Sequence, residues 1–282
     1  MKKSYLIITG LLVILVFISL FLAIFQKNIP LGSKLALIRI EGPIIDSKNA
    51  VDELKEYTKD NSIKAIVLRV DSPGGAVAPS QEIYEEVKKA VAKKKVVVSM
   101  GSVAASGGYY ISAPATKIIA NPGTLTGSIG VIMEIPNIEG LMNKIGIKTE
   151  VIKSGRHKDI ASAFRTMGKE EREILQGVMD NVHEQFIKAV SEGRKIKMEE
   201  LRKIADGRIF TGEQAKTYGL VDELGTLEDA IKTAATLAGI REEPQVISRK
   251  NKFSVIDILR NKFPKEIADI FPTVKIKYLY SP

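Results

Sequence analysis

Three turns rich in small residues contain the residues of this chain best suited to chemistry. They read DSPGG (71–75), GSVAASGGYY (101–110) and NPGTLTGSIG (121–130), and each directly follows a short apolar run. Ligands of open α/β sheets bind at the carboxyl ends of the strands. Because glycine lets the backbone approach a ligand closely, three such turns would bring backbone N–H groups together around one small volume. The spacing therefore predicts a site built largely from backbone.

Ser106 is the candidate nucleophile in these turns. It lies in the segment ASGG, at the point where a tight turn opens the predicted helix SGGYYISA. There the N–H of Gly107 would face a developing oxyanion, aided by the helix dipole, and a second N–H could come from Gly75. The same small residues would also let a helix pack closely on a sheet, so the spacing alone leaves both interpretations open.

A serine nucleophile needs a general base, and the residues by themselves leave that base open. His157 together with Asp159 would complete a Ser–His–Asp triad. A lysine would serve instead if it were desolvated enough to be neutral, as in a Ser–Lys dyad. The chain has 42 Lys and Arg residues, so composition cannot choose among them.

The composition argues against several other kinds of chemistry. The chain has no cysteine, which excludes a disulfide framework, an iron–sulfur cluster and a thiol nucleophile. It has two histidines and no His-rich motif, so we expect no metal site. The net charge is +9, but basic residues alternate with acidic ones and no basic stripe carries aromatic residues. This favours a solvated surface over nucleic-acid binding, with attraction to anionic lipid as a third interpretation.

Strands must alternate with helices to position these turns, and the pattern after Pro30 predicts such an alternation. The apolar runs lack a strict period of two, as is typical of strands that are covered on both faces. We therefore expect an α/β fold with a largely parallel sheet. The predicted strands are 35–40, 65–70, 96–100, 117–120, 130–135 and 149–153, and the predicted helices among them are 49–60, 79–94 and 137–146.

The second half of the chain is mostly helical in pattern. From Lys169 to about Ala205 an apolar stripe with a spacing of four predicts a long helix. Thr226 and Asp229 resemble a capping box, and Gly239 would end that helix. From Gln245 onward the chain is rich in lysine and interrupted by proline, which predicts a peripheral tail. The stripe consists of Ile174, Val178, Val182, Phe186 and Val190.

Tyr5–Phe25 contains no charged residue and predicts a transmembrane helix. At 1.5 Å per residue this segment would span roughly 31 Å, the thickness of a bilayer core. A cleaved signal peptide has a shorter apolar region followed by a small-x-small site, and no such site precedes Lys27. We expect a retained signal anchor. Flanking lysines are nearly balanced, and the free amino terminus favours an N-terminus in the cytoplasm.

Five longer motifs resemble the signal peptide peptidase A (SppA) family of Ser–Lys proteases, in its short single-domain form. The resemblance covers nearly all of residues 34–239. It implies a ClpP/crotonase-like superhelix of repeated β-β-α units, preceded by one transmembrane helix. The motifs are VLRVDSPGG, SMGSVAASGGYYIS, NPGTLTGSIGV, VIKSGRHKDIAS and GRIFTGEQAKTYGLVDELG.

The resemblance implies a domain division and a role for each residue that matches a motif. Residues 1–27 would form a cytoplasmic stub and signal anchor, 28–244 the protease domain, and 245–282 a basic C-terminal tail. The matched residues are Ser106 as nucleophile, Lys158 as general base, Ser128 as the hydroxyl that orients the lysine, and Gly75 and Gly107 as oxyanion-hole donors. His157 would then be a bystander, and no cofactor or metal is implied.

The function implied is that of a serine endopeptidase at the cell membrane, with its catalytic domain outside the cytoplasm. Its substrates would be remnant signal peptides and other apolar peptides, with no nucleic-acid partner. The short forms are expected to build homo-oligomeric rings, and we hypothesise that Ser106 of one subunit meets Lys158 of its neighbour.

Two alternatives share the expected fold. One is the membrane protease encoded beside stomatin-like proteins, which also uses a Ser–Lys dyad but whose long forms carry further membrane helices. The other is a crotonase-type acyl-CoA enzyme, which would need carboxylates where this chain has Ser106 and Ser128. A catalytically dead scaffold of this fold is disfavoured by the intact Ser106, Lys158 and Ser128.

Overall fold

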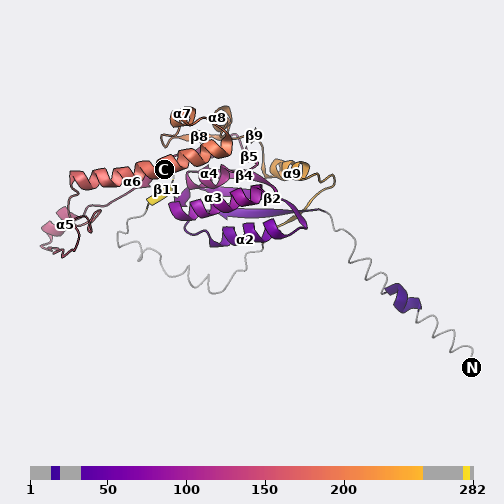
Figure 1. The fold of residues 1–282 in the computed structure, drawn as a ribbon, viewed down its shortest axis with the longest axis horizontal. Coiled ribbons are helices and arrows are strands. Elements are labelled where there is room, and N and C mark those ends of the chain that lie inside the picture. Colours follow the sequence, from indigo (N-terminus) through magenta and orange to yellow (C-terminus); the bar gives the residue numbers. More distant parts are fainter. Residues whose placement is uncertain (1–13, 20–32, 250–275, 280–282) are drawn as a thin grey trace, which may run out of the picture.

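A parallel sheet forms the centre of the computed structural model, which describes residues 14–19, 33–249 and 276–279 (Figure 1). Its strands follow the order β10-β1-β2-β4-β5-β9, with all neighbours parallel. The expected α/β class with a parallel-rich sheet is thereby confirmed and fits a ClpP/crotonase-like fold. The strands are β1 (Lys34–Glu41), β2 (Ile63–Ser72), β4 (Lys95–Ala105), β5 (Lys117–Ala120), β9 (Glu223–Leu224) and β10 (Gln245–Ile247).

Both faces of this sheet are covered, which explains why its strands are apolar without alternation. Alternate residues of β1 and β2 belong to two different cores: Ile38 packs with the helices of one face, and Leu37 with the helix of the other. The first face carries α2 (Lys48–Lys59) and α3 (Val77–Val91), and the second carries α9 (Leu227–Leu237). The capping box of Thr226 and Asp229 at the start of α9 is confirmed.

The end of β4 extends into a branch of the sheet. There β6 (Leu125–Gly127) runs parallel to β4, and β8 (Ile209–Thr211) pairs with β6 in the antiparallel direction. The short helix α8 (Gly212–Thr217) follows β8, and α4 (Gly107–Ser112) follows β4. This branch brings the second and third small-residue turns to one edge of the sheet.

A long helix, α6 (Lys169–Arg194), runs from the body of the protein outward to α5 (Glu139–Lys144) (Figure 1). Its second half is packed into the core through Phe186 and Val190. Its first half is not, because Ile174 and Val178 are 43% and 40% exposed. The predicted apolar stripe is therefore buried along only part of its length. The helix ends at Arg194 and is followed by Lys195 in the left-handed region, before α7 (Met198–Arg202).

A second, three-stranded sheet lies beside the first. Its order is β3 (Gly74–Ala76), β11 (Ile276–Leu279) and β7 (Ile132–Met133), and both pairings are antiparallel. The segment from Gln245 onward, predicted to be a peripheral tail, thus supplies β10 to the main sheet and β11 to the small sheet. The domain boundary at residue 245 stays a prediction.

One predicted strand is wrong. Residues 149–153 form no strand, and Val151 and Ile152 are 49% and 100% exposed. A run of β-branched residues becomes a strand only where a neighbouring strand and a core receive it, and this segment lies in the projecting region between α5 and α6. The predicted strand 130–135 is shortened to Ile132–Met133.

The predicted membrane segment lies mostly outside the described residues. Residues 14–19 are helical with exposed side chains, and the other positions of Tyr5–Phe25 are not described. Within the described parts of the chain, no helix has the length and apolar character needed to cross a bilayer.

Candidate active site

The three small-residue turns lie side by side, as predicted. Ser72, at the end of β2, pairs with Ala104 of β4, and Ala105 of β4 pairs with Gly127 of β6. The carboxyl ends of three parallel strands therefore meet at one place. This juxtaposition follows from the sheet order and brings together Ser72 and Gly127, which are 55 positions apart in the chain.

Ser106 is held in a conformation that few serines adopt. It has φ 53° and ψ −117°, and it joins β4 to α4. Its N–H donates to the carbonyl of Gly127 at 2.8 Å. The residue is only 1% exposed, and its Oγ has no hydrogen-bond partner within the described parts of the chain. A strained backbone of this kind costs about 1–3 kcal/mol and is concentrated at functional sites.

Gly75 and Gly107 approach each other closely. A Cβ added at Gly107 would lie 3.2 Å from the Gly75 nitrogen and 2.7 Å from the Ser80 Oγ. A Cβ added at Gly75 would lie 2.1 Å from the carbonyl oxygen of Ile44. Both positions therefore require glycine, and both backbones border the Ser106 turn.

Ser128 directly follows Gly127, the glycine whose carbonyl accepts the hydrogen bond from the Ser106 N–H. It also has a positive φ of 51°, and its N–H donates to the carbonyl of Arg208 at 2.8 Å. Ser128 is 7% exposed and lines a cavity of about 440 Å³. The other side chains around this cavity include Gln176, Asp180, His183 and Asp206. Asp180 and Asp206 thus bring two carboxylates to the cavity, and Asp206 is paired with Arg208.

Lys158 is not part of this cluster within one chain. It is exposed, on a loop between α5 and α6, whereas Ser106 is almost completely buried. No hydrogen bond joins Lys158 to Ser106 or Ser128 among the described residues. The fold of one chain therefore assembles Ser106, Ser128, Gly75 and Gly107, and leaves Lys158 apart.

The loop that carries Lys158 is anchored by ion pairs. The Nε of Arg165 donates to Asp159 at 2.8 Å, and its Nη1 donates to Glu171, at the start of α6, also at 2.8 Å. Lys153 also contacts Asp159. The Arg165 guanidinium holds the pKa of Asp159 well below its usual range and lowers the pKa of Glu171 to about 2. The loop is thus a defined structure at neutral pH.

A Ser–His–Asp triad is not assembled. The Nε2 of His157 lies 3.6 Å from Glu170, and Asp159 is engaged by Arg165 and Lys153. Among the described residues, His157 therefore forms no ion pair with Asp159 and no hydrogen bond with Ser106.

Comparison with known proteins identifies the family. The model of peptidase family S49 matches residues 88–241, which include Ser106, Ser128 and Lys158. The chain belongs to this family. It is a serine peptidase of the SppA family, in the single-domain form.

Three relatives illustrate this membership of family S49. A candidate protease of Methanocaldococcus jannaschii is 39% identical over 269 residues, which is 88% of this chain and 86% of that protein. A candidate protease of Synechocystis is 47% identical over 208 residues, covering 73% and 75% of the two chains. A protein of Enterococcus faecium named as a candidate signal peptide peptidase SppA is 39% identical over 186 residues, covering 65% of this chain and 54% of its own.

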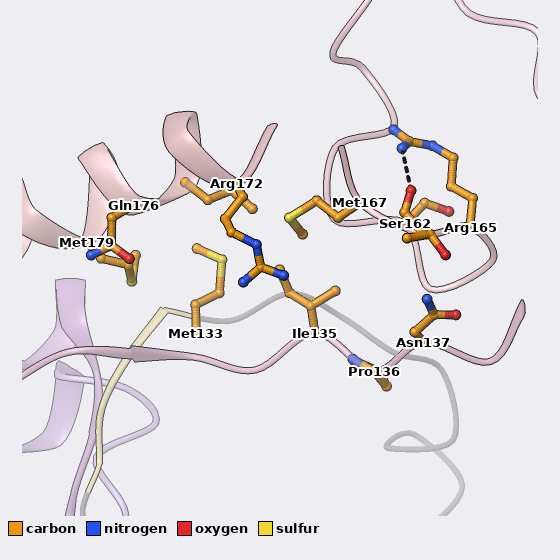
Figure 2. A pocket seen from close by; sticks show the side chains of 12 residues that line it. Met133, Ile135, Pro136, Asn137, Ser162, Arg165, Met167, Arg172, Gln176 and Met179 are labelled. Carbon is orange, nitrogen blue, oxygen red and sulfur yellow. Dashed lines mark hydrogen bonds between the residues drawn. The ribbon is translucent and has the colours of Figure 1, made fainter. Parts of the chain in front are cut away.

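The S49 peptidase has a second cavity, of about 340 Å³, next to β7. Three methionines line it, Met133, Met167 and Met179, together with Ile135 and Leu175. Figure 2 shows Met133, Met167 and the Arg172 side chain directed into this space. The rest of the lining is mostly polar and includes Arg165 and Arg172, so the cavity combines adaptable apolar side chains with hydrogen-bond donors.

Two features of the site were not predicted from the sequence. His183 lies close to Ser128, with its Nε2 3.2 Å from the carbonyl oxygen of Ile129. Nothing in the spacing of the α6 stripe distinguishes this histidine from a surface residue. The second feature is β11, whose position depends on pairing between segments about 200 residues apart.

Proposed function

We propose that this S49 peptidase is a membrane-anchored endopeptidase that uses Ser106 as nucleophile and Lys158 as general base. The observation that carries the proposal is Ser106 itself, a buried serine with positive φ beside the two glycine backbones, whose Oγ has no hydrogen-bond partner among the described residues. Such a hydroxyl contributes little to stability, because its hydrogen-bonding capacity is buried and unused. An available Oγ at a strained turn is suited to attack a carbonyl.

In this proposal neutral Lys158 takes the proton of Ser106 as its Oγ attacks the carbonyl carbon of a peptide bond. The N–H groups of Gly75 and Gly107 stabilise the tetrahedral oxyanion. Lys158 then gives the proton to the leaving amine, and water hydrolyses the acyl-enzyme. Ser128 hydrogen-bonds the lysine amine and helps to hold it in the neutral form.

The base would come from a neighbouring subunit. Two observations support this hypothesis: Lys158 is exposed on the projecting loop, and the carboxylate of Asp180 lines the cavity beside Ser128. The ammonium of Lys158 is complementary in charge to that carboxylate, whereas Arg156 is already paired with Glu170. The projecting region also exposes apolar side chains, such as Leu141, Ile145 and Ile152, that a second copy would cover. Head-to-tail contacts of this kind close into a ring when the rotation permits.

The proposed substrates are remnant signal peptides and other apolar peptides at the cell membrane. The methionines in the cavity next to β7 support this class, as does the name of the Enterococcus faecium relative. The segment Tyr5–Phe25 would anchor the enzyme in the membrane. The catalytic domain would lie outside the cytoplasm, and a superhelix of repeated β-β-α units would form its scaffold.

The test uses the full chain in detergent with a fluorophosphonate probe and a library of apolar peptides. We expect labelling and hydrolysis by the unmodified chain and neither by Ser106→Ala. Ser102→Ala is the matched control, because Ser102 is an exposed serine of β4, four residues before Ser106. Hydrolysis by Ser106→Ala above about a tenth of the unmodified rate would contradict the assignment. The cleavage sites in the library would also separate the signal-peptide substrate class from that of the stomatin-associated proteases.

A further inference from the structure

The amino ends of the parallel strands meet at one end of the main sheet, opposite the end that carries the candidate active site. Lys34, the first residue of β1, pairs with Ile63 of β2, and Ala65 of β2 pairs with Lys95, the first residue of β4. Because these strands are parallel, α2 and α3 must run back along the sheet between them (Figure 1). Both helices therefore end at the amino end of the sheet.

Lysines gather at this amino end, in the stretches that begin a strand or follow one of the two helices. Asp60 is the only acidic residue in the stretches 33–34, 59–64 and 92–95. Residues 241–243, before β10, add one arginine and two glutamates, so the positive charge lies over β1, β2 and β4. The six lysines are Lys34, Lys59, Lys64, Lys93, Lys94 and Lys95.

Five of these six ammonium groups are available to an anionic ligand. Lys94 is not, because its Nζ donates to the carbonyls of Tyr57 and Asp60, both at 2.6 Å. Burial lowers the pKa of Lys94, and the charge of Lys64 adds to this against the opposing effect of Asp60, so like charges lie close together here. Among the described residues, the other five lysines form no ion pair with a carboxylate. This amino-end cluster consists of Lys34, Lys59, Lys64, Lys93 and Lys95.

The chain enters the main sheet at the amino-end cluster on its way from the segment proposed as a membrane anchor. Eight residues, 26–33, separate Phe25 from Lys34. A fully extended chain spans about 3.5 Å per residue, so Lys34 lies within about 30 Å of the end of that segment. Ser106 follows the opposite end of β4, about 35 Å from Lys95. The amino end is thus the part of the sheet with the shortest tether to the bilayer.

We propose that the amino-end cluster binds the anionic phospholipid headgroups of the bilayer in which the chain is anchored. The inference rests on the proposed function, because the anchor is what brings this end of the sheet to a membrane. Groups of four to eight basic residues next to a membrane segment are typical of attraction to anionic lipid. Each lysine close to such a surface strengthens the attraction by about fivefold.

Docking through the amino end would also set the position of the active site. The sheet would stand on the bilayer with its carboxyl end outward, and Ser106 would lie about 35 Å above the headgroups. A peptide would therefore have to leave the bilayer before Ser106 could reach it. This deepens the proposed function, since it favours released apolar peptides over segments that still span the membrane.

The first test measures how accessible each lysine is in the full-length chain on vesicles. The vesicles are of phosphatidylcholine alone, or contain about a third phosphatidylglycerol, and a neutral acylating reagent followed by mass spectrometry gives a rate for each lysine. We expect the amino-end cluster to react several-fold more slowly on anionic than on neutral vesicles, and this difference to vanish at high salt. Lys48, at the other end of α2, should react at the same rate on both. Equal rates on both vesicles for the amino-end cluster would overturn the proposal, because the cluster would then face solvent or another partner.

The second test measures the distance of the cluster from the bilayer. The chain has no cysteine, so Asn61→Cys, in the exposed turn after α2, provides a single site for a fluorescent dye. Energy transfer to acceptor-labelled lipid should be higher on anionic than on neutral vesicles. Lys64→Glu with Lys93→Glu should remove this increase, whereas Lys216→Glu with Lys232→Glu, on exposed positions of α8 and α9, should keep it. An increase that both pairs keep, or that both lose, overturns the proposal.

Flotation of the same chains separates this inference from the proposed function. Every variant should float with phosphatidylcholine vesicles, because Tyr5–Phe25 is unchanged in all of them. A chain that floats with these vesicles but shows no effect of anionic lipid overturns the role of the amino-end cluster alone. A chain that floats with anionic vesicles alone supports the cluster and overturns the proposed anchor. A chain that floats with neither overturns both.

Discussion

The N–H of Ser106 donates a hydrogen bond of 2.8 Å to the carbonyl of Gly127. This single contact joins the turn after β4 to the turn after β6, and so places Ser106 next to Ser128. Gly127 has φ +79°, and a Cβ added there would lie 2.5 Å from the Phe210 ring. The contact therefore depends on a glycine that no other residue can replace without strain.

Gly127→Ala should consequently destabilise the protein and reduce peptidase activity. A positive φ at alanine costs about 1–2 kcal/mol, to which the clash with Phe210 adds. For a domain of this size each 1 kcal/mol lowers the melting temperature by about 2–4 °C. Gly123→Ala is the control, because no atom of the described residues lies within 4 Å of a Cβ added at Gly123. Equal melting temperatures for the two variants, measured by circular dichroism, would contradict this account of the turn.

Ser106→Gly should be more stable than Ser106→Ala, although both should be inactive. Alanine keeps the strain of φ 53° and ψ −117°, whereas glycine relieves it, by about 1–2 kcal/mol. The difference in free energy of unfolding can be measured by denaturant titration of the two variants. If the free energy of unfolding is the same for the glycine and the alanine variant, the turn is not strained in the folded protein.

Lys158→Arg should be inactive, while His157→Ala and His183→Ala should keep most of the peptidase activity. Guanidinium stays charged and cannot accept the proton of a serine. For the same reason the rate of the unmodified enzyme should rise from acidic to alkaline pH, since only the unprotonated lysine acts as a base. Steady-state kinetics over this range would test the assignment. Loss of activity in His183→Ala, with unchanged stability, would instead favour His183, which lies beside Ser128, as the general base.

The loop that carries Lys158 should loosen at acidic pH. Arg165 holds the pKa values of Asp159 and Glu171 below their ordinary values of about 4. Both carboxyls therefore bind protons less readily in the folded loop. Their stabilisation is fully present above pH about 4 and is lost as the pH falls toward the pKa of Glu171, about 2.

Hydrogen exchange of residues 153–168, corrected for intrinsic rates, would measure this loosening. Arg165→Ala should expose the loop at neutral pH and remove the pH dependence. Arg202→Ala is the control, because Arg202 pairs with Glu184 on α6, outside the loop. If the amide hydrogens of residues 153–168 exchange at the same rate in both variants, Arg165 does not anchor the loop.

Chains carrying Ser106→Ala and Lys158→Ala should complement each other if neighbours share the site. The two variants would be co-expressed with different tags, and complexes that contain both would be purified. With random mixing, about a quarter of the sites would regain both groups. Complexes that contain both chains but remain as inactive as either parent would show that each chain builds its own dyad.

The sequence by itself determined the local elements and the residue types of the site. The apolar runs predicted β1, β2, β4 and β5 of the main sheet, and the capping residues Thr226 and Asp229 predicted the start of α9, because these signals act over a few neighbouring positions. The small residues around Ser106 and Ser128 predicted tight turns after strands for the same reason.

Only the tertiary structure decided which of these residues meet. Ser106 and Ser128 lie together because β6 adds to the end of β4, whereas Lys158 lies apart because its loop is anchored to α6 by Arg165. Residues 149–153 have the composition of a strand but no partner, and Ile276–Leu279 forms a strand because β3 and β7 offer unpaired edges. Strand pairing is a contact between distant segments, so the periodicity of one segment cannot reveal its partner.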